Sequence, residues 1–171
     1  GQSANEVSIG AWATAISLGI TLKASKSLKV RIGGEFDMAS GDDDATDKEL
    51  NTFNNLYHTN HAHYGQADFV SWRNMTAFSG NLKFIFAKKK TWLKLAYWNV
   101  NLNTEKDLWY GVSGAPQGIV TNGKDTGLYH EIDATFNTDA GIVDVQCGVS
   151  YLMGGDAIVT SKADPLFMYL S

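Results

Sequence analysis

Apolar and polar residues alternate strictly along several segments, and this two-residue period is typical of β-strands with one apolar face. The clearest case is the segment 28–37, LKVRIGGEFD. Its apolar positions are Leu28, Val30, Ile32 and Phe36, and its opposite positions carry Lys29, Arg31, Glu35 and Asp37. A packed core rarely accepts four charges from one strand, because unpaired buried charge is costly. We therefore expect this charged face either to meet solvent or to line water inside a barrel.

The same alternation recurs along the chain and predicts seven strands. The predicted strands are 6–22, 28–39, 75–87, 91–103, 127–137, 142–153 and 165–171. Within 91–103 the apolar positions change face between Tyr97 and Val100, as a β-bulge would permit. Two prolines against 17 glycines, with 12% aromatic residues, also favour strands over helices. The sequence predicts an all-β protein.

The connections between these strands alternate in length. Segments 24–27, 87–90 and 138–141 are short, whereas those that follow Ala39, Asn103 and Gly154 are long and polar. Short turns at one end and long loops at the other are typical of an antiparallel transmembrane β-barrel with periplasmic turns and extracellular loops. The expected lipid-facing residues include Val30, Ile32, Phe84, Ile132 and Val145. The expected pore-lining residues are Lys29, Arg31, Glu35, Asp37, Lys83, Glu131, Asp133 and Asp144.

This topology also predicts how the chain relates to a whole barrel. If the short turns are periplasmic, the first strand starts outside the membrane and the last descends toward the periplasm. Bacterial barrels have an even number of strands. We therefore expect residues 1–171 to form a single domain that is the C-terminal part of a longer barrel, with 40–74 as a long extracellular or pore-folded loop.

Composition narrows the class of partner and of chemistry. Fourteen basic against 18 acidic residues leave no basic stripe for nucleic acid. The single Cys147 has no second cysteine to pair with, and it reads as a small apolar strand residue. A triad such as His61, Asp68 and Ser71 can be written, but the sequence has no nucleophile elbow and no phosphate-binding glycine loop. We expect no enzyme activity and no cofactor.

The segment after the second predicted strand carries a motif. Its elements are Ala39-Ser40-Gly41-Asp42, Phe53, Leu56-Tyr57-His58-Thr59-Asn60-His61, His63-Tyr64-Gly65, Asp68 and Trp72-Arg73-Asn74. This pattern resembles the signature region of the alginate-export family of outer-membrane β-barrels, although His58 stands where that family has proline. Weaker similarity extends through the alternating strands to Phe167-Met168-Tyr169-Leu170, so the resemblance covers nearly the whole chain.

The resemblance implies a passive channel in the outer membrane of a Gram-negative bacterium, which passes an anionic polysaccharide or another polar solute through a basic lumen. Its implied partners are outer-membrane lipid, the transported solute, and periplasmic export or envelope components. The predicted lumen has three basic and five acidic residues, which leaves the substrate open. Two alternatives also stay open. One is a structural barrel that sheathes an envelope component such as an electron carrier, and the other is a soluble β-sandwich or lipocalin-like binding protein.

The histidines are interpreted as loop architecture rather than as a metal site, because their spacing is not that of structural zinc sites. The residues of this loop motif are His58, Asn60, His61, His63, Tyr64, Asp68 and Trp72. We expect Tyr64 and Trp72 to pack against strand ends or loops, and His61 to hydrogen-bond to backbone or to Asp68.

Two further groups of residues carry expectations. Asp42, Asp43 and Asp44 offer oxygen ligands for Ca²⁺ but lack the EF-hand pattern, so a solvated loop is expected. The tryptophans are expected to form an aromatic girdle at the membrane boundary. These are Trp72, Trp92, Trp98 and Trp109.

Overall fold

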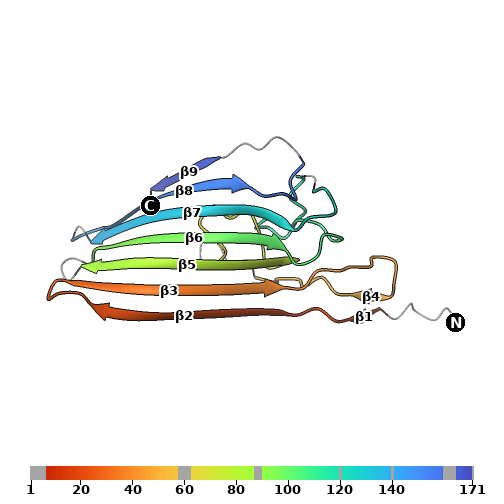
Figure 1. Ribbon diagram of the computed structural model, residues 1–171, viewed down its shortest axis with the longest axis horizontal. Helices are drawn as coiled ribbons and strands as arrows, with labels where there is room; N and C mark the ends of the chain where they lie inside the picture. Colours follow the sequence, from red (N-terminus) through yellow and green to blue (C-terminus); the bar gives the residue numbers. More distant parts are fainter. Residues whose placement is uncertain are drawn as a thin grey trace.

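A computed structural model describes residues 7–57, 63–86, 90–119, 121–139, 141–159 and 165–170, and they form one large antiparallel sheet (Figure 1). Its seven strands are β2 (Ala13–Lys23), β3 (Leu28–Ala39), β5 (Met75–Phe86), β6 (Trp92–Leu102), β7 (Gly127–Asp139), β8 (Asp144–Gly154) and β9 (Leu166–Leu170). Each strand pairs with the next in chain order, which confirms the predicted all-β antiparallel arrangement. Among these described residues, no helix is long and apolar enough to cross a membrane.

The first predicted strand, 6–22, is wrong in one respect, because the structure divides it. Ser8 and Ile9 form the short strand β1 (Ser8–Ile9), which pairs in parallel with β4 (Glu49–Leu50) of the following loop. Gly10 separates β1 from β2, and a Cβ atom there would overlap the Asn51 side chain. A continuous strand with a larger residue at this position would therefore push the loop away.

One face of the sheet, here called the apolar face, is exposed across all seven strands. The register aligns Ile20, Ile32, Leu82 and Leu95 as neighbours on it, and Ile132 of β7 lies 49% exposed. No second sheet covers this face in the part of the chain that the structure describes. The soluble β-sandwich interpretation is therefore wrong, since it requires these side chains to pack inside a core.

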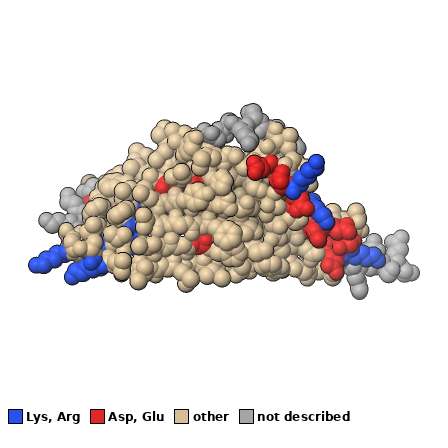
Figure 2. All heavy atoms as spheres, in the orientation of Figure 1, with Lys and Arg blue, Asp and Glu red and all other residues tan. Residues whose placement is uncertain are grey.

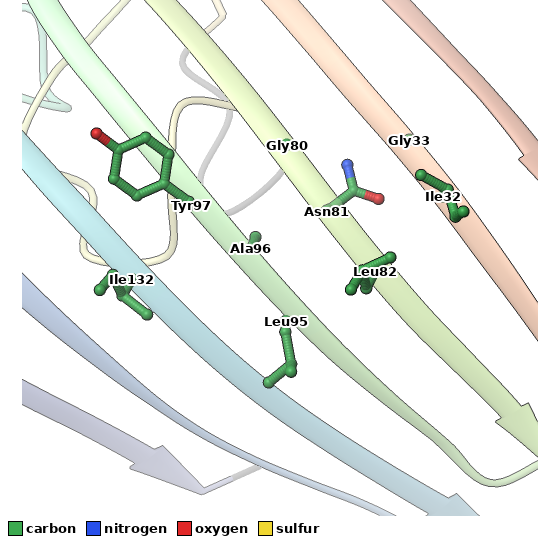
Figure 3. A pocket seen from close by; sticks show the side chains of 9 residues that line it. All are labelled: Ile32, Gly33, Gly80, Asn81, Leu82, Leu95, Ala96, Tyr97 and Ile132. Atoms are coloured by element: carbon green, nitrogen blue, oxygen red, sulfur yellow. The ribbon is translucent and has the colours of Figure 1, made fainter.

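The apolar face contains an open hollow of about 490 Å³ in the middle of the sheet. Figure 3 shows the side chains of Ile32, Leu82, Leu95 and Ile132 along this hollow, which Gly80, without a side chain, also lines. The strands here are 11 to 13 residues long. At about 3.3 Å per residue and a tilt near 40°, they span about 30 Å, which is the thickness of a bilayer core.

The opposite face, here called the loop-covered face, holds the core. The loop between β3 and β5 folds back on it, as Figure 1 shows behind β5 to β7. From this loop, Tyr64 and Val70 are buried against Ala77, Trp98 and Val100 of the sheet. The fold thus buries the loop against one face and leaves the other face apolar and open.

This packing explains the change of face predicted within 91–103. Strand β6 alternates without interruption, so Tyr97 lies on the apolar face and Val100 on the loop-covered face. The register instead shifts in the pairing of β6 with β7, where Leu128 is the extra residue between the partners of Val100 and Asn101. Between Tyr97 and Val100, apolar side chains occur on both faces of β6 because the loop buries the loop-covered face there.

Candidate functional site

The loop-covered face carries a row of basic side chains in its half nearest the short turns. Arg31, Lys83 and Lys94 are direct register partners on three adjacent strands, and Lys83 Nζ lies 3.8 Å from the centre of the Trp92 ring. The Arg31 guanidinium lies over Gly19 of β2, where a side chain would collide with it. Like charges placed directly opposite destabilise a sheet, so this row is costly unless an anion or water screens it. Lys94 was missed in the sequence because the faces of its strand were ambiguous.

The other half of this face, nearest the long loops, carries carboxylates that are buried beneath the loop. Asp37, Glu131 and Asp133 are buried, with at most 3% of each residue exposed, and Glu35 is partly buried. Ser150 Oγ donates a 2.6 Å hydrogen bond to Asp133 Oδ1. The charges of this face are therefore divided along the strands into a mainly basic half that is partly exposed and an acidic half that is largely buried.

The eight residues expected to line a pore all lie on the loop-covered face by register. They do not form one group. Lys29 and Asp144 are exposed near the short turns, Arg31 and Lys83 belong to the basic row, and the other four lie beneath or beside the loop. The latter are Glu35, Asp37, Glu131 and Asp133.

Glu131 fastens the loop to the sheet. Its Oε1 atom accepts hydrogen bonds from the backbone N–H groups of Gln66, at 2.7 Å, and Ala67, at 2.9 Å. The preceding Gly65 has a φ of 103°, and a Cβ atom on it would overlap the Glu131 carboxylate. Only glycine satisfies both the left-handed backbone and this close approach. The His-Tyr-Gly element of the motif thus has a structural reason for its glycine.

Aromatic residues of the motif stack beneath the loop. The rings of His63 and Trp72 lie 5.2 Å apart at 25°, and Tyr64 is buried between strand and loop residues. Burial, together with the charges of Asp68 and Asp37, raises the pKa of Tyr64 to about 12. Tyr64 is therefore neutral at physiological pH. His58, Asn60 and His61 lie outside the described residues, so the expected hydrogen bond of His61 stays a prediction.

A hydrogen-bond network holds the start and the end of the loop. Ser40 Oγ accepts from Trp12 N at 2.9 Å and donates to Asn51 O at 2.7 Å. Asn74, fully buried, donates through Nδ2 to the carbonyls of Thr104 and Leu108. A Cβ atom on Gly41 would overlap the Asn74 side chain, which accounts for the glycine of the Ala-Ser-Gly-Asp element.

Asp107 is a second centre of this network, and no pattern in the sequence pointed to it. Its Oδ2 atom accepts from Thr52 Oγ1 at 2.6 Å and from Asp42 N at 3.0 Å. Its Oδ1 atom accepts from Tyr110 OH at 2.8 Å. Burial and this hydrogen bond raise the pKa of Tyr110 to about 12, and the Arg73 guanidinium lies 4.2 Å from the centre of its ring. Asp107 thereby joins two long loops at the same end of the sheet.

The acidic run considered for calcium forms turns. Asp42 Oδ1 accepts from Asp44 N, and Asp44 Oδ1 accepts from the backbone and hydroxyl of Thr46. These hydrogen bonds from Thr46 lower the pKa of the Asp44 carboxyl. The Asp42 and Asp44 carboxylates therefore accept hydrogen bonds within their own turns.

The predicted tryptophan girdle is wrong. Trp98 and Trp109 are buried in the core, and Trp109 Nε1 donates to the Phe69 carbonyl at 2.9 Å. Trp72 stacks beneath the loop, and Trp92 lies on the loop-covered face beside Lys83. The aromatic residues of the apolar face are phenylalanines and tyrosines instead. They are Phe36, Phe78, Tyr97 and Tyr151 toward the long loops, and Phe84, Phe86 and Phe136 toward the short turns.

Charge is also divided between the two ends of the sheet. Figure 2 views the apolar face, which is almost free of charge between a mainly basic short-turn end and a mainly acidic long-loop end. Lys23, Lys26 and Lys90 lie at the former, and Asp43, Asp44 and Glu49 are exposed at the latter. An uncharged band between two charged ends is the surface that a bilayer requires.

These features define a class of protein: an antiparallel transmembrane β-barrel of the outer-membrane type, with its charges on the face away from lipid. The family profile described as alginate export matches residues 1–164, and the chain belongs to this family. Its members are outer-membrane export proteins. No protein among the curated sequences matches the chain.

The Gly65 contact predicts a local effect. Replacing Gly65 with alanine should unseat the loop from Glu131, because the new Cβ overlaps the carboxylate and the backbone at φ 103° is strained for alanine. Hydrogen exchange at the amides of Gln66 and Ala67 should accelerate at least tenfold, while exchange in β3 stays unchanged. Gly80→Ala is the matched control, since nothing lies within 4 Å of its added Cβ. Equal protection in both variants would contradict the proposed role of Gly65.

The apolar face predicts a large effect of charge at its centre. Leu82→Lys should lower the free energy of unfolding in bilayers by about 2–4 kcal/mol, the cost of a lysine at the midplane of a barrel wall. Asn81→Lys places the same charge one residue away on the loop-covered face and should cost much less. Urea unfolding in lipid vesicles measures both. Similar losses in the two variants would show that the apolar face is not the lipid-facing one.

Proposed function

We propose that this chain lines a passive export path for an anionic polysaccharide, or a similar anionic solute, across the outer membrane of a Gram-negative bacterium. In this proposal the loop-covered face bounds the lumen and no chemical step occurs. The observation that carries the proposal is the basic row of Arg31, Lys83 and Lys94 in the accessible half of that face. The membership of the alginate-export family supports the same substrate class.

Burial determines which charges of the loop-covered face a passing solute can meet. Counted from the sequence, the face has more acidic than basic residues. Asp37, Glu131 and Asp133 are buried, however, so a passing solute would not meet them. Arg31, Lys83 and Lys94 are each only partly buried. The charge that faces water inside the lumen is therefore mainly positive at this level, and it would attract anions.

The two ends of the barrel suggest an orientation. Short turns are periplasmic in bacterial barrels and long loops are extracellular. The basic row would then stand in the periplasmic half of the lumen, where it raises the local concentration of an anionic polymer. The acidic loops at the other end would repel the polymer once it has emerged. The arrangement needs no energy source beyond the polymer gradient.

The loop 40–74 is proposed to set the width of the lumen. Its described part packs on the sheet through Tyr64, Val70 and the hydrogen bonds to Glu131. A loop that buried aromatic rings hold against the barrel wall narrows the lumen. It also occupies part of the space that an enclosed protein would need, so the export channel is favoured over a barrel that sheathes another component.

The basic row predicts the ion selectivity of the channel. At about 10 Å each cation attracts a monovalent anion by about 0.4 kcal/mol in water, and salt at 0.1 M screens this to a little over a third. Each cation repels a monovalent cation as strongly as it attracts an anion, so the triple change Arg31→Gln, Lys83→Gln and Lys94→Gln should lower the anion-to-cation permeability ratio by about fourfold to fivefold. Reversal potentials of the full-length protein in planar bilayers, under a salt gradient, measure this ratio.

A matched control uses three lysines of the short-turn end. Lys23→Gln, Lys26→Gln and Lys90→Gln remove the same charge from exposed positions outside the basic row. This control should leave selectivity nearly unchanged. An equal shift in both triple variants would refute the role of the basic row. A folded protein that conducts no ions at all would instead favour the sheath alternative.

A further inference from the structure

Three metal-ligating side chains converge where the loop meets β3. Glu35 and Asp37 are two residues apart on the strand, so both point to the loop-covered face, and His63 comes from the loop. His63 Nδ1 contacts Glu35 Oε1 and lies 3.9 Å from Asp37 Oδ1. One ligating atom from each residue lies within 4.8 Å of the others. A single ion could touch all three after small side-chain movements.

The state of Asp37 argues that something is bound there. Its side chain is fully buried, and neither carboxylate oxygen accepts a hydrogen bond from the residues that the structure describes. Burying a carboxylate without hydrogen-bond partners costs free energy, and native proteins rarely contain a buried carboxylate without them. Glu35, two residues away on the same face of β3, brings a second carboxylate to this place. A single imidazole cannot balance two carboxylates, whereas a divalent cation balances them fully.

We propose that Glu35, Asp37 and His63 bind one divalent transition-metal ion, with Zn²⁺ as the best match. An imidazole nitrogen beside two carboxylate oxygens suits zinc and its neighbours, whereas calcium and magnesium prefer oxygen ligands alone. Three protein ligands leave a fourth position for water. The ion holds the loop to β3, while the hydrogen bonds of Gln66 and Ala67 to Glu131 hold it to β7, three strands away.

The surroundings of His63 fit a ligand histidine. Its ring stacks on Trp72, which holds the imidazole plane, and such orientation is a regular feature of metal sites. The His63 side chain is 33% exposed, which gives the ion a path from the lumen. This ligand set shares only His63 with the histidine trio of the sequence, and it needs neither His58 nor His61.

Metal content of the purified protein tests the proposal. Full-length protein in detergent, stripped with a chelator and then dialysed against micromolar Zn²⁺, should retain one equivalent per chain. Asp37→Asn and His63→Gln should each weaken zinc binding at least tenfold in isothermal titration. His130→Gln, on the apolar face, is the control histidine and should change nothing. Ca²⁺ should not compete at equal concentration.

A second measurement avoids the risk that a variant misfolds. Co²⁺ added to the unaltered protein should give visible d–d absorption bands of a four- or five-coordinate site with a nitrogen ligand, and Zn²⁺ should abolish them. The proposal is overturned if the unaltered protein retains no zinc. It is also overturned if folded Asp37→Asn and His63→Gln proteins both bind zinc as tightly as the unaltered one. Neither result depends on transport, so the export proposal would stand or fall separately.

Discussion

The requirement that one face of the sheet contain no charge governs the rest of this structure. A lipid-facing wall has no water to solvate ions, so each charged side chain of the spanning strands must point the other way. The register meets this requirement, because Arg31, Glu35, Lys83 and Glu131 all lie on the loop-covered face. The concentration of charge on that face determines which residues the long loop has to cover.

That concentration creates a second problem, which the long loop resolves. Acidic residues near the long-loop end would repel an anionic solute and one another, and the loop covers them. It brings backbone N–H groups to Glu131 and an imidazole to Glu35. Ordering a loop of this length costs conformational entropy, and the burial of Tyr64 and Val70 offsets that cost. Loop and carboxylates are therefore best understood as one unit.

The sequence predicted the parts of the fold that follow from the two-residue alternation of apolar and polar side chains. The strands, their two faces and the alternation of short and long connections follow from neighbouring residues. The parallel pair β1 and β4, the burial of Trp98 and Trp109, and the role of Asp107 did not follow. These depend on contacts between residues far apart in the chain, such as Thr52 with Asp107. The convergence of His63 on Glu35 and Asp37 is of the same kind, and periodicity alone cannot reveal it.

One signal in the sequence does report a long-range contact, however. Along β6 the loop-covered face carries Lys94 in its short-turn half and buried apolar residues from Trp98 to Leu102 in its long-loop half. The same change separates Lys83 from Ala77 on β5. On both strands it marks the level at which the loop begins to cover the sheet. A change from charged to apolar residues on one face, without a break in alternation, thus indicates how far the loop covers the sheet, because the uncovered part of that face meets water and the covered part meets the loop.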